Sequence, residues 1–147
     1  MAVSGIGRGA YRVVLAAGVL LACSETAEPE PACLEAVDTE CTPLFEPTFS
    51  EIHARKLSVT CSSGGASCHG PSGRKGGLAL SDFDEAYALL LGTDGGKARV
   101  VPFDPECSEL VRRLDASGTD VMPPGEPLSE GERCAVRIWI ANGATKE

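Results

Sequence analysis

The chain has 147 residues, with 13 basic and 21 acidic side chains and a formal net charge of −8. This excess of acidic residues argues against nucleic acid or an anionic lipid surface as the partner, because both would repel the protein. The length suits one domain with a modest core, so a second folded domain is not expected.

The amino-terminal residues predict an export signal. Arg8 and Arg12 precede an apolar run over residues 13–22. This run is too short for the roughly 20 residues that span a bilayer, but it fits a cleavable secretion signal. We expect residues 1–22 to be a signal peptide and not a transmembrane anchor.

The end of this run, Leu20-Leu21-Ala22-Cys23, resembles the processing site of bacterial lipoproteins, in which the cysteine is acylated and becomes the new amino terminus. The alternative is an ordinary secretory signal with a chance cysteine. We expect an exported protein that is anchored to the cell envelope by a lipid on Cys23. Ser24 follows this cysteine, which by the same resemblance favours the outer membrane.

Residues 23–47 predict a lipidated, acidic, proline-rich tether. From Ser24 to Pro47 there are four prolines, seven acidic residues and no basic residue. Such a composition cannot bury enough apolar surface to fold by itself. The domain should therefore begin at residue 48 and extend to residue 147.

Seven cysteines are many for this length, and six remain if Cys23 is lipidated. An even number in an oxidising compartment predicts disulfides or thioethers. Six cysteines allow 15 pairings, so any assignment depends on local spacing alone. By spacing, Cys33 would close a small loop with Cys41, and Cys107 would join Cys134. A metal site at either pair is disfavoured in this setting.

Residues 48–147 predict a small all-α domain, a bundle of three to four short helices with a long Gly-rich loop. Capping signals and helical spacing indicate the elements, and no alternating strand pattern is convincing. The expected helices run from Phe49 to about Ser58, from Asp82 to Leu91 after Ser81, from Asp104-Pro105 to about Ser117-Gly118, and from the capping box Ser129-Glu130-Gly131-Glu132 to Asn142-Gly143, with a loop over residues 59–80.

The residues most suited to binding a cofactor or metal lie in that loop, at Cys61 and at Cys68-His69-Gly70. In c-type haem attachment, two cysteines three positions apart form thioethers with the haem vinyl groups, and the adjacent histidine is an axial ligand of the iron. The second cysteine and the histidine are in place here, but Gly65 occupies the position of the first cysteine. Zinc at this site lacks an obvious fourth ligand.

The sequence from Phe49 to Ala144 resembles the planctomycete-type c-type cytochrome domains of exported bacterial proteins. The resemblance depends on the order of several segments, which are Cys68-His69-Gly70, Gly77-Leu78-Ala79-Leu80, Val100-Val101-Pro102, Pro105-Glu106-Cys107-Ser108-Glu109-Leu110, Val121-Met122-Pro123-Pro124 and Trp139-Ile140-Ala141-Asn142-Gly143-Ala144.

The resemblance implies a haem c whose iron is bound by His69 and by Met122, the methionine of the Met-Pro-Pro segment, with Cys68 as an attachment point. A core-filling role for Met122 and a surface role for His69 are the alternatives. The spacing of Cys61 leaves three possibilities open: one thioether through Cys68, two thioethers through a loop bulged at Gly64-Gly65, or a disulfide between the two cysteines. His53, on the first helix, is expected to be solvated.

These observations lead to two hypotheses for the function. The first is a membrane-tethered monohaem cytochrome c-like protein that passes single electrons to a redox partner protein and catalyses no bond chemistry. The second is a haem-free, disulfide-stapled surface lipoprotein with a binding or structural role. The spacing of Cys61 favours the second, and the ordered segments favour the first.

Overall fold

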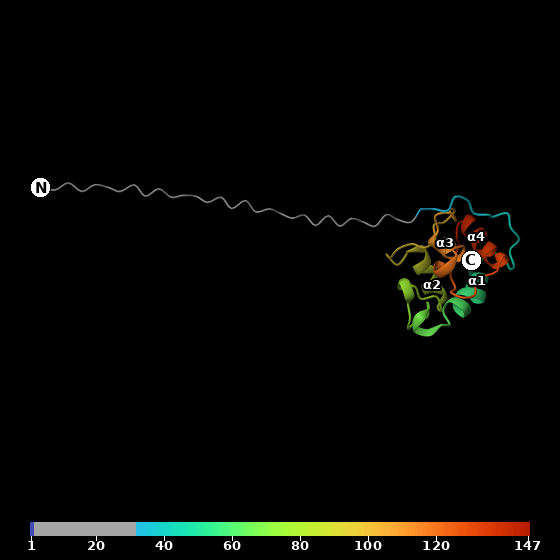
Figure 1. The fold of residues 1–147 in the computed structure, drawn as a ribbon, viewed down its shortest axis with the longest axis horizontal. Coiled ribbons are helices and arrows are strands. Elements are labelled where there is room, and N and C mark those ends of the chain that lie inside the picture. Colours follow the sequence, from blue (N-terminus) through green and yellow to red (C-terminus); the bar gives the residue numbers. More distant parts are fainter. Residues whose placement is uncertain (2–31) are drawn as a thin grey trace. The chain divides into compact units, whose positions relative to one another are not determined.

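The computed structural model describes Met1 and residues 32–147. The described part folds into short helices joined by long loops, and it contains no strand (Figure 1). The elements are α1 (Phe49–Ile52), the π-helix η1 (His53–Cys61), three 3₁₀ turns η2 (Gly65–Ser67), η3 (Lys75–Gly77) and η4 (Gly118–Asp120), and the helices α2 (Phe83–Leu91), α3 (Glu109–Leu114) and α4 (Glu130–Ala141). The predicted all-α class is confirmed.

None of the helices within residues 32–147 has both the length and the apolar composition that crossing a bilayer requires. The predicted signal peptide over residues 1–22 and the predicted lipidation residue Cys23 lie outside the described residues, apart from Met1.

The first helix begins where its capping signal predicts. The side chain of Thr48 accepts a hydrogen bond from the amide of Glu51 at 3.4 Å. The helix then widens into η1, where the Ser58 hydroxyl donates to the carbonyl of His53 five residues earlier at 2.9 Å. The helical segment therefore reaches Cys61, three residues beyond the predicted end.

Two predicted helix starts are displaced. α2 is capped by Asp82, which accepts from the amide of Glu85 at 2.9 Å, and not by Ser81. α3 begins at Glu109, because Asp104 instead caps an isolated turn by accepting from the amide of Cys107 at 3.0 Å. The buried Ser108 then donates to the Asp104 carbonyl and accepts from a neighbouring loop amide, which reorients the chain before the helix starts.

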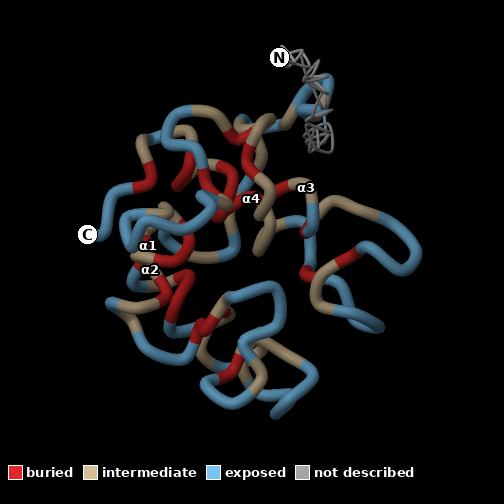
Figure 2. Tube along the Cα trace, turned by 90° about the vertical axis from the view of Figure 1, so that its left-hand side faces the viewer, coloured by how far each residue is buried: buried red, intermediate tan, exposed pale blue. Residues whose placement is uncertain are grey.

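α4 matches its prediction, with the reciprocal capping box of Ser129 and Glu132 at its start and Asn142 at its end. It packs against α1 and α3, and α2 packs against η1. Phe49 lies at the centre of the core, with its ring centroid 5.4 Å from that of Trp139 and 4.9 Å from that of Phe83. Figure 2 shows buried residues along these helices and exposed residues over much of the connecting loops.

His53 is buried and only 8% exposed, so the expectation of a solvated residue was wrong. It extends the aromatic cluster, with its ring centroid 5.2 Å from that of Phe83 and 5.8 Å from that of Phe49. Its helix turns this side chain inward, a consequence of tertiary packing that no local motif announces.

The predicted disulfide pairing is corrected by the structure. All four cysteines form disulfides, but Cys33 is joined to Cys107 and Cys41 to Cys134. The two bridges therefore fasten the segment 32–47 to α4 and to the turn before α3. Local spacing failed because each true partner is more than 70 residues away along the chain.

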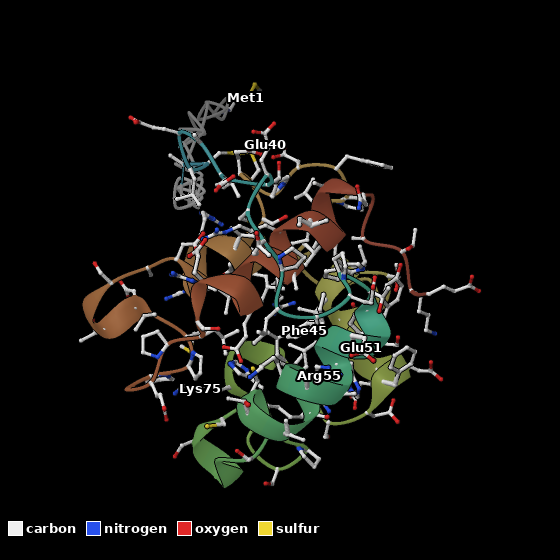
Figure 3. The ribbon with its side chains drawn as sticks, turned by 90° about the vertical axis from the view of Figure 1, so that its right-hand side faces the viewer. Met1, Glu40, Phe45, Glu51, Arg55 and Lys75 are labelled. Carbon is white, nitrogen blue, oxygen red and sulfur yellow. A yellow bond between two sulfur atoms is a disulfide. The ribbon has the colours of Figure 1, made fainter. Side chains whose placement is uncertain are left out.

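The segment 32–47, which we call the strap, is thus held on the domain and is not a free tether over this part. Leu34 and Phe45 pack against the core, and Leu44 donates its amide to the carbonyl of Gly131 at 2.9 Å. Arg55 lies 5.5 Å above the ring of Phe45, and Figure 3 shows this strap residue beside Glu51 and Arg55. Its composition disfavours folding alone, and the two disulfides and its contacts with the core hold it on the domain.

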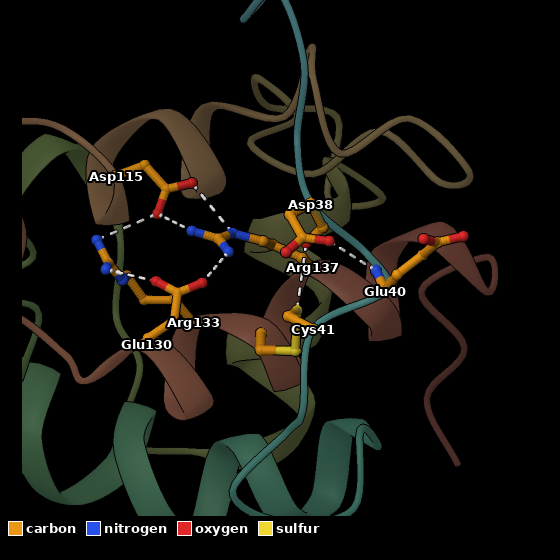
Figure 4. The surroundings of a disulfide bond; sticks show 8 residues. Asp38, Glu40, Cys41, Asp115, Glu130, Arg133 and Arg137 are labelled. Carbon is orange, nitrogen blue, oxygen red and sulfur yellow. Dashed lines mark hydrogen bonds and ion pairs between the residues drawn. A yellow bond between two sulfur atoms is a disulfide. The ribbon is translucent and has the colours of Figure 1, made fainter.

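An ion-pair cluster lies near the second bridge. Arg137, on α4 and only 7% exposed, donates to both carboxylate oxygens of Asp115 at 2.6 and 3.1 Å and to Glu130 at 2.5 Å. Figure 4 shows this cluster, with Arg133, in the surroundings of the Cys41 disulfide. The cluster ties the start of α4 to the end of α3.

Candidate functional site

One cavity of about 580 Å³ brings together the residues that the sequence singled out. Cys61, Cys68, His69 and Met122 all line it, although Met122 lies more than fifty residues away from the others in the chain. Nine of the other twenty lining residues are aliphatic, and they come from several elements: Ile52, Leu57, Leu78, Leu80, Leu90, Leu110, Leu114, Leu128 and Val136. The size falls in the range of small-molecule and cofactor pockets, about 300–1,000 Å³.

His69 is held in a defined orientation. Its ring nitrogen Nδ1 lies 2.8 Å from the backbone carbonyl of Lys75, and a carbonyl can only accept, so Nδ1 carries the proton. In a neutral imidazole this leaves Nε2 with a free lone pair. The backbone of His69 is fixed as well, because its carbonyl accepts from the amide of Leu80 at 2.7 Å. The Lys75 carbonyl at Nδ1 is the kind of hydrogen-bond partner that metal-binding histidines ordinarily have at their other ring nitrogen.

Met122 enters the cavity wall from the loop between η4 and α4. Its amide donates to the carbonyl of Arg113 at 2.8 Å, which fixes the loop to the end of α3. The peptide bond to Pro123 is cis, and Pro123 and Pro124 line the cavity next to it. Within residues 32–147, Met122 is the only methionine. Its thioether is the one soft ligand besides the two free thiols on this wall.

Cys61 and Cys68 are both unbridged in the structure, so the predicted alternative of a disulfide between them is not what is observed. Burial, followed by the nearby Cys68, raises the pKa of the Cys61 thiol to about 11, although Lys56 acts in the opposite direction. Cys61 is therefore almost entirely protonated at neutral pH and is a poor nucleophile there.

The segment between the two cysteines is a compact bulge. Its 3₁₀ turn η2 leads into Cys68, and the amide of His69 returns to the carbonyl of Cys61 at 3.1 Å. Close backbone approach requires glycine here, since a Cβ on Gly70 would lie 2.6 Å from the carbonyl oxygen of Ser62. A Cβ on Gly64 would lie 2.1 Å from the Cys68 sulfur. The loop is thus bulged near Gly64, whereas the number of thioethers stays a prediction.

The family comparison agrees with this geometry. Residues 66–126 match the family model described as Planctomycete cytochrome C. Over this stretch, the chain is similar to planctomycete-type cytochrome c. The matched residues include Cys68, His69 and Met122, whereas Cys61 lies before them. A search of curated proteins and of solved structures finds no match.

The residues that line the cavity are of the kinds that a haem requires. A porphyrin needs apolar surroundings, a ligand with a free nitrogen lone pair and, for covalent attachment, free thiols, and the lining includes residues of each kind. Within residues 32–147, no group of three or more His, Cys, Asp or Glu side chains is arranged to hold a metal ion. The His and Met pair that would bind haem iron needs no such cluster.

The charges around the cavity contrast with the rest of the protein. Five basic residues line it and only one acidic residue does: Lys56, Lys75, Lys97, Arg99 and Arg113 against Glu109. Lys97 and Arg113 pair with Glu109 at 3.2 and 3.9 Å. In the part of the chain that the structure describes, Lys75 and Arg99 form no ion pair with an acidic side chain. These five basic residues could not be predicted from the sequence, because they belong to different segments and come together only in the folded chain.

Proposed function

We propose that this protein is a single-electron carrier whose cytochrome c-like domain holds one haem between His69 and Met122. The observation that supports this most directly is the orientation of His69. Its Nδ1–H bonds the Lys75 carbonyl, so the nitrogen available to a metal is Nε2, and both His69 and Met122 line one aliphatic cavity. Cys68 precedes His69 and provides a thiol for covalent attachment.

When bound, the haem would supply a reversible one-electron couple at its iron. The residues of the chain set the conditions for that couple. A thioether ligand such as Met122 favours the reduced iron and raises the reduction potential relative to two histidines. The aliphatic walls exclude water and lower the local dielectric constant, which limits the solvent reorganisation that accompanies each electron transfer.

The same ligand pair argues for electron transfer and against catalysis. If His69 and Met122 both bound the iron, the chain would supply both of its remaining ligands and would leave no position for oxygen or peroxide. We therefore propose a carrier and not an enzyme.

Lys75 and Arg99 are suited to the two carboxylates of a haem. Both line the cavity without an acidic partner among the described residues. The Arg99 guanidinium is already positioned, since it donates to the carbonyls of Gly76 at 2.6 Å and Lys97 at 2.5 Å. A preoriented guanidinium loses little conformational entropy when it binds a carboxylate.

The location and the partner follow from the sequence and remain part of this proposal. The leader, the lipid on Cys23 and a position in the cell envelope, with the outer membrane favoured, would place the domain beside a membrane. The redox partner would be another protein of that compartment. The net charge of the chain disfavours nucleic acid.

The ligand assignment is tested with the protein exported from a host able to mature c-type cytochromes. His69→Ala should abolish covalently bound haem, whereas Met122→Ala should retain it and leave the reduced iron able to bind carbon monoxide. Leu128→Ala, another residue of the cavity wall, is the matched control that should retain a low-spin iron closed to carbon monoxide. If Met122→Ala and the control gave the same low-spin spectrum, Met122 would not be the second ligand.

A further inference from the structure

We propose that Cys61 forms a second thioether with the haem, in spite of the six residues that separate it from Cys68. This inference rests on the proposed haem function and concerns how the chain holds the cofactor. In the usual motif the first cysteine would stand where this chain has Gly65. The proposal gives the role of that cysteine to Cys61, which lies outside the residues matched by the family model.

The decisive observation is one backbone hydrogen bond. In a helical Cys-x-x-Cys-His turn, the histidine amide would donate to the carbonyl of the first cysteine, four residues before it. Here the amide of His69 donates to the carbonyl of Cys61 at 3.1 Å, across eight residues. The same two backbone groups are therefore hydrogen-bonded as in a short motif, and the four extra residues are looped out.

The looped-out segment explains why this closure is possible. Residues 63–67 are exposed, and of these five only Ser67 lines the cavity, so most of the insertion lies outside it. The backbones pack closely at Gly73, where a Cβ would lie 2.4 Å from the carbonyl oxygen of Cys68 and 2.5 Å from that of Gly65. Glycine at this position allows the bulge to fold back against the segment that carries His69.

The side chain of Cys61 is also on the correct surface. It extends from the last residue of η1, lines the same cavity as Cys68, and is not engaged in a disulfide. The reaction would be an addition that requires no oxidant. The thiol S–H adds across the vinyl C=C, the sulfur bonds the carbon next to the ring, and the hydrogen goes to the terminal carbon. No atom is lost and the iron keeps its charge.

The test uses the wild-type exported protein and a tryptic peptide that the sequence provides. Cleavage after Lys56 and Arg74 releases residues 57–74, which contain both Cys61 and Cys68 and no other cysteine. The protein is denatured without reduction, alkylated, digested and analysed by mass spectrometry. We expect this peptide to carry the mass of one haem and no alkyl group.

Each other outcome has a distinct meaning. A peptide with one haem and one alkyl group on Cys61 would overturn the second thioether and leave the proposed function intact. A peptide without haem, whether doubly alkylated or internally disulfide-bonded, would overturn both proposals.

A pair of variants gives an independent reading. Cys61→Ala and Cys68→Ala should each retain one thioether, and each should shift the reduced pyridine haemochrome band to longer wavelength, because one vinyl group stays conjugated with the ring. If Cys61→Ala left that band unchanged from the wild type, the second thioether would be disproved.

Discussion

Removing the bridge between Cys41 and Cys134 should lower the free energy of unfolding by an amount that depends on the length of the loop that the bridge closes. Alone, this bridge would close a loop of 93 residues, but the bridge between Cys33 and Cys107 already shortens the path. Eight positions separate Cys33 from Cys41 and 27 separate Cys107 from Cys134, so the second bridge closes an effective loop of about 35 residues. Chain entropy then gives about 4 kcal/mol at 25 °C.

The double variant Cys41→Ala with Cys134→Ala tests this magnitude without leaving a free thiol. With a urea slope of about 2 kcal/mol/M, a loss of about 4 kcal/mol lowers the unfolding midpoint by about 2 M. The matched control is Cys33→Ala with Cys41→Ala, which removes one member of each bridge. In this variant Cys107 and Cys134 should either react with an alkylating agent or be joined to each other. The reasoning fails if the first variant shows two newly reactive thiols at Cys33 and Cys107, or unfolds at the wild-type urea concentration.

Three further predictions concern the ion-pair cluster, the buried thiol and the membrane anchor. Asp115→Asn should destabilise the fold by about 1–3 kcal/mol, because Arg137 keeps its charge in a largely buried position and loses its bidentate partner; an unchanged urea midpoint would contradict this. Since the pKa of Cys61 is raised to about 11, its alkylation in the haem-free protein should accelerate about tenfold per pH unit from pH 7 to 10; a plateau near pH 8.5 would refute the raised pKa. Cys23→Ala should release the protein from membranes or leave an uncut precursor, and equal retention after a carbonate wash would dispose of the lipid anchor.

Local signals in the sequence predicted what depends on neighbouring residues. The capping box of Ser129 and Glu132 starts α4 as expected, and Gly92 ends α2 in the left-handed conformation. Both features are decided within one helical turn, where side-chain capping and the conformational freedom of glycine dominate. The bulge near Gly64 was one of three alternatives that the local sequence left open, and Gly65, with a φ of 59°, permits the reversal there.

Features that depend on distant residues were not predictable in this way. The disulfide partners lie 74 and 93 positions apart, and local spacing carries no information about such distances. The burial of His53 results from Phe83, which a different helix supplies. The basic residues at the cavity lie in η1, η3, α3 and a loop, so only the folded chain shows that they gather around an otherwise aliphatic wall.

The most direct test of the central claim is the absorbance spectrum of the wild-type protein, exported from a host that matures c-type cytochromes and purified without added haem. If the cavity between His69 and Met122 holds a haem, the protein should show a Soret band and, after reduction, the sharp visible bands of a low-spin c-type haem. A folded protein with both disulfides intact and no Soret absorbance would contradict the proposal, and it would identify the domain as a haem-free module.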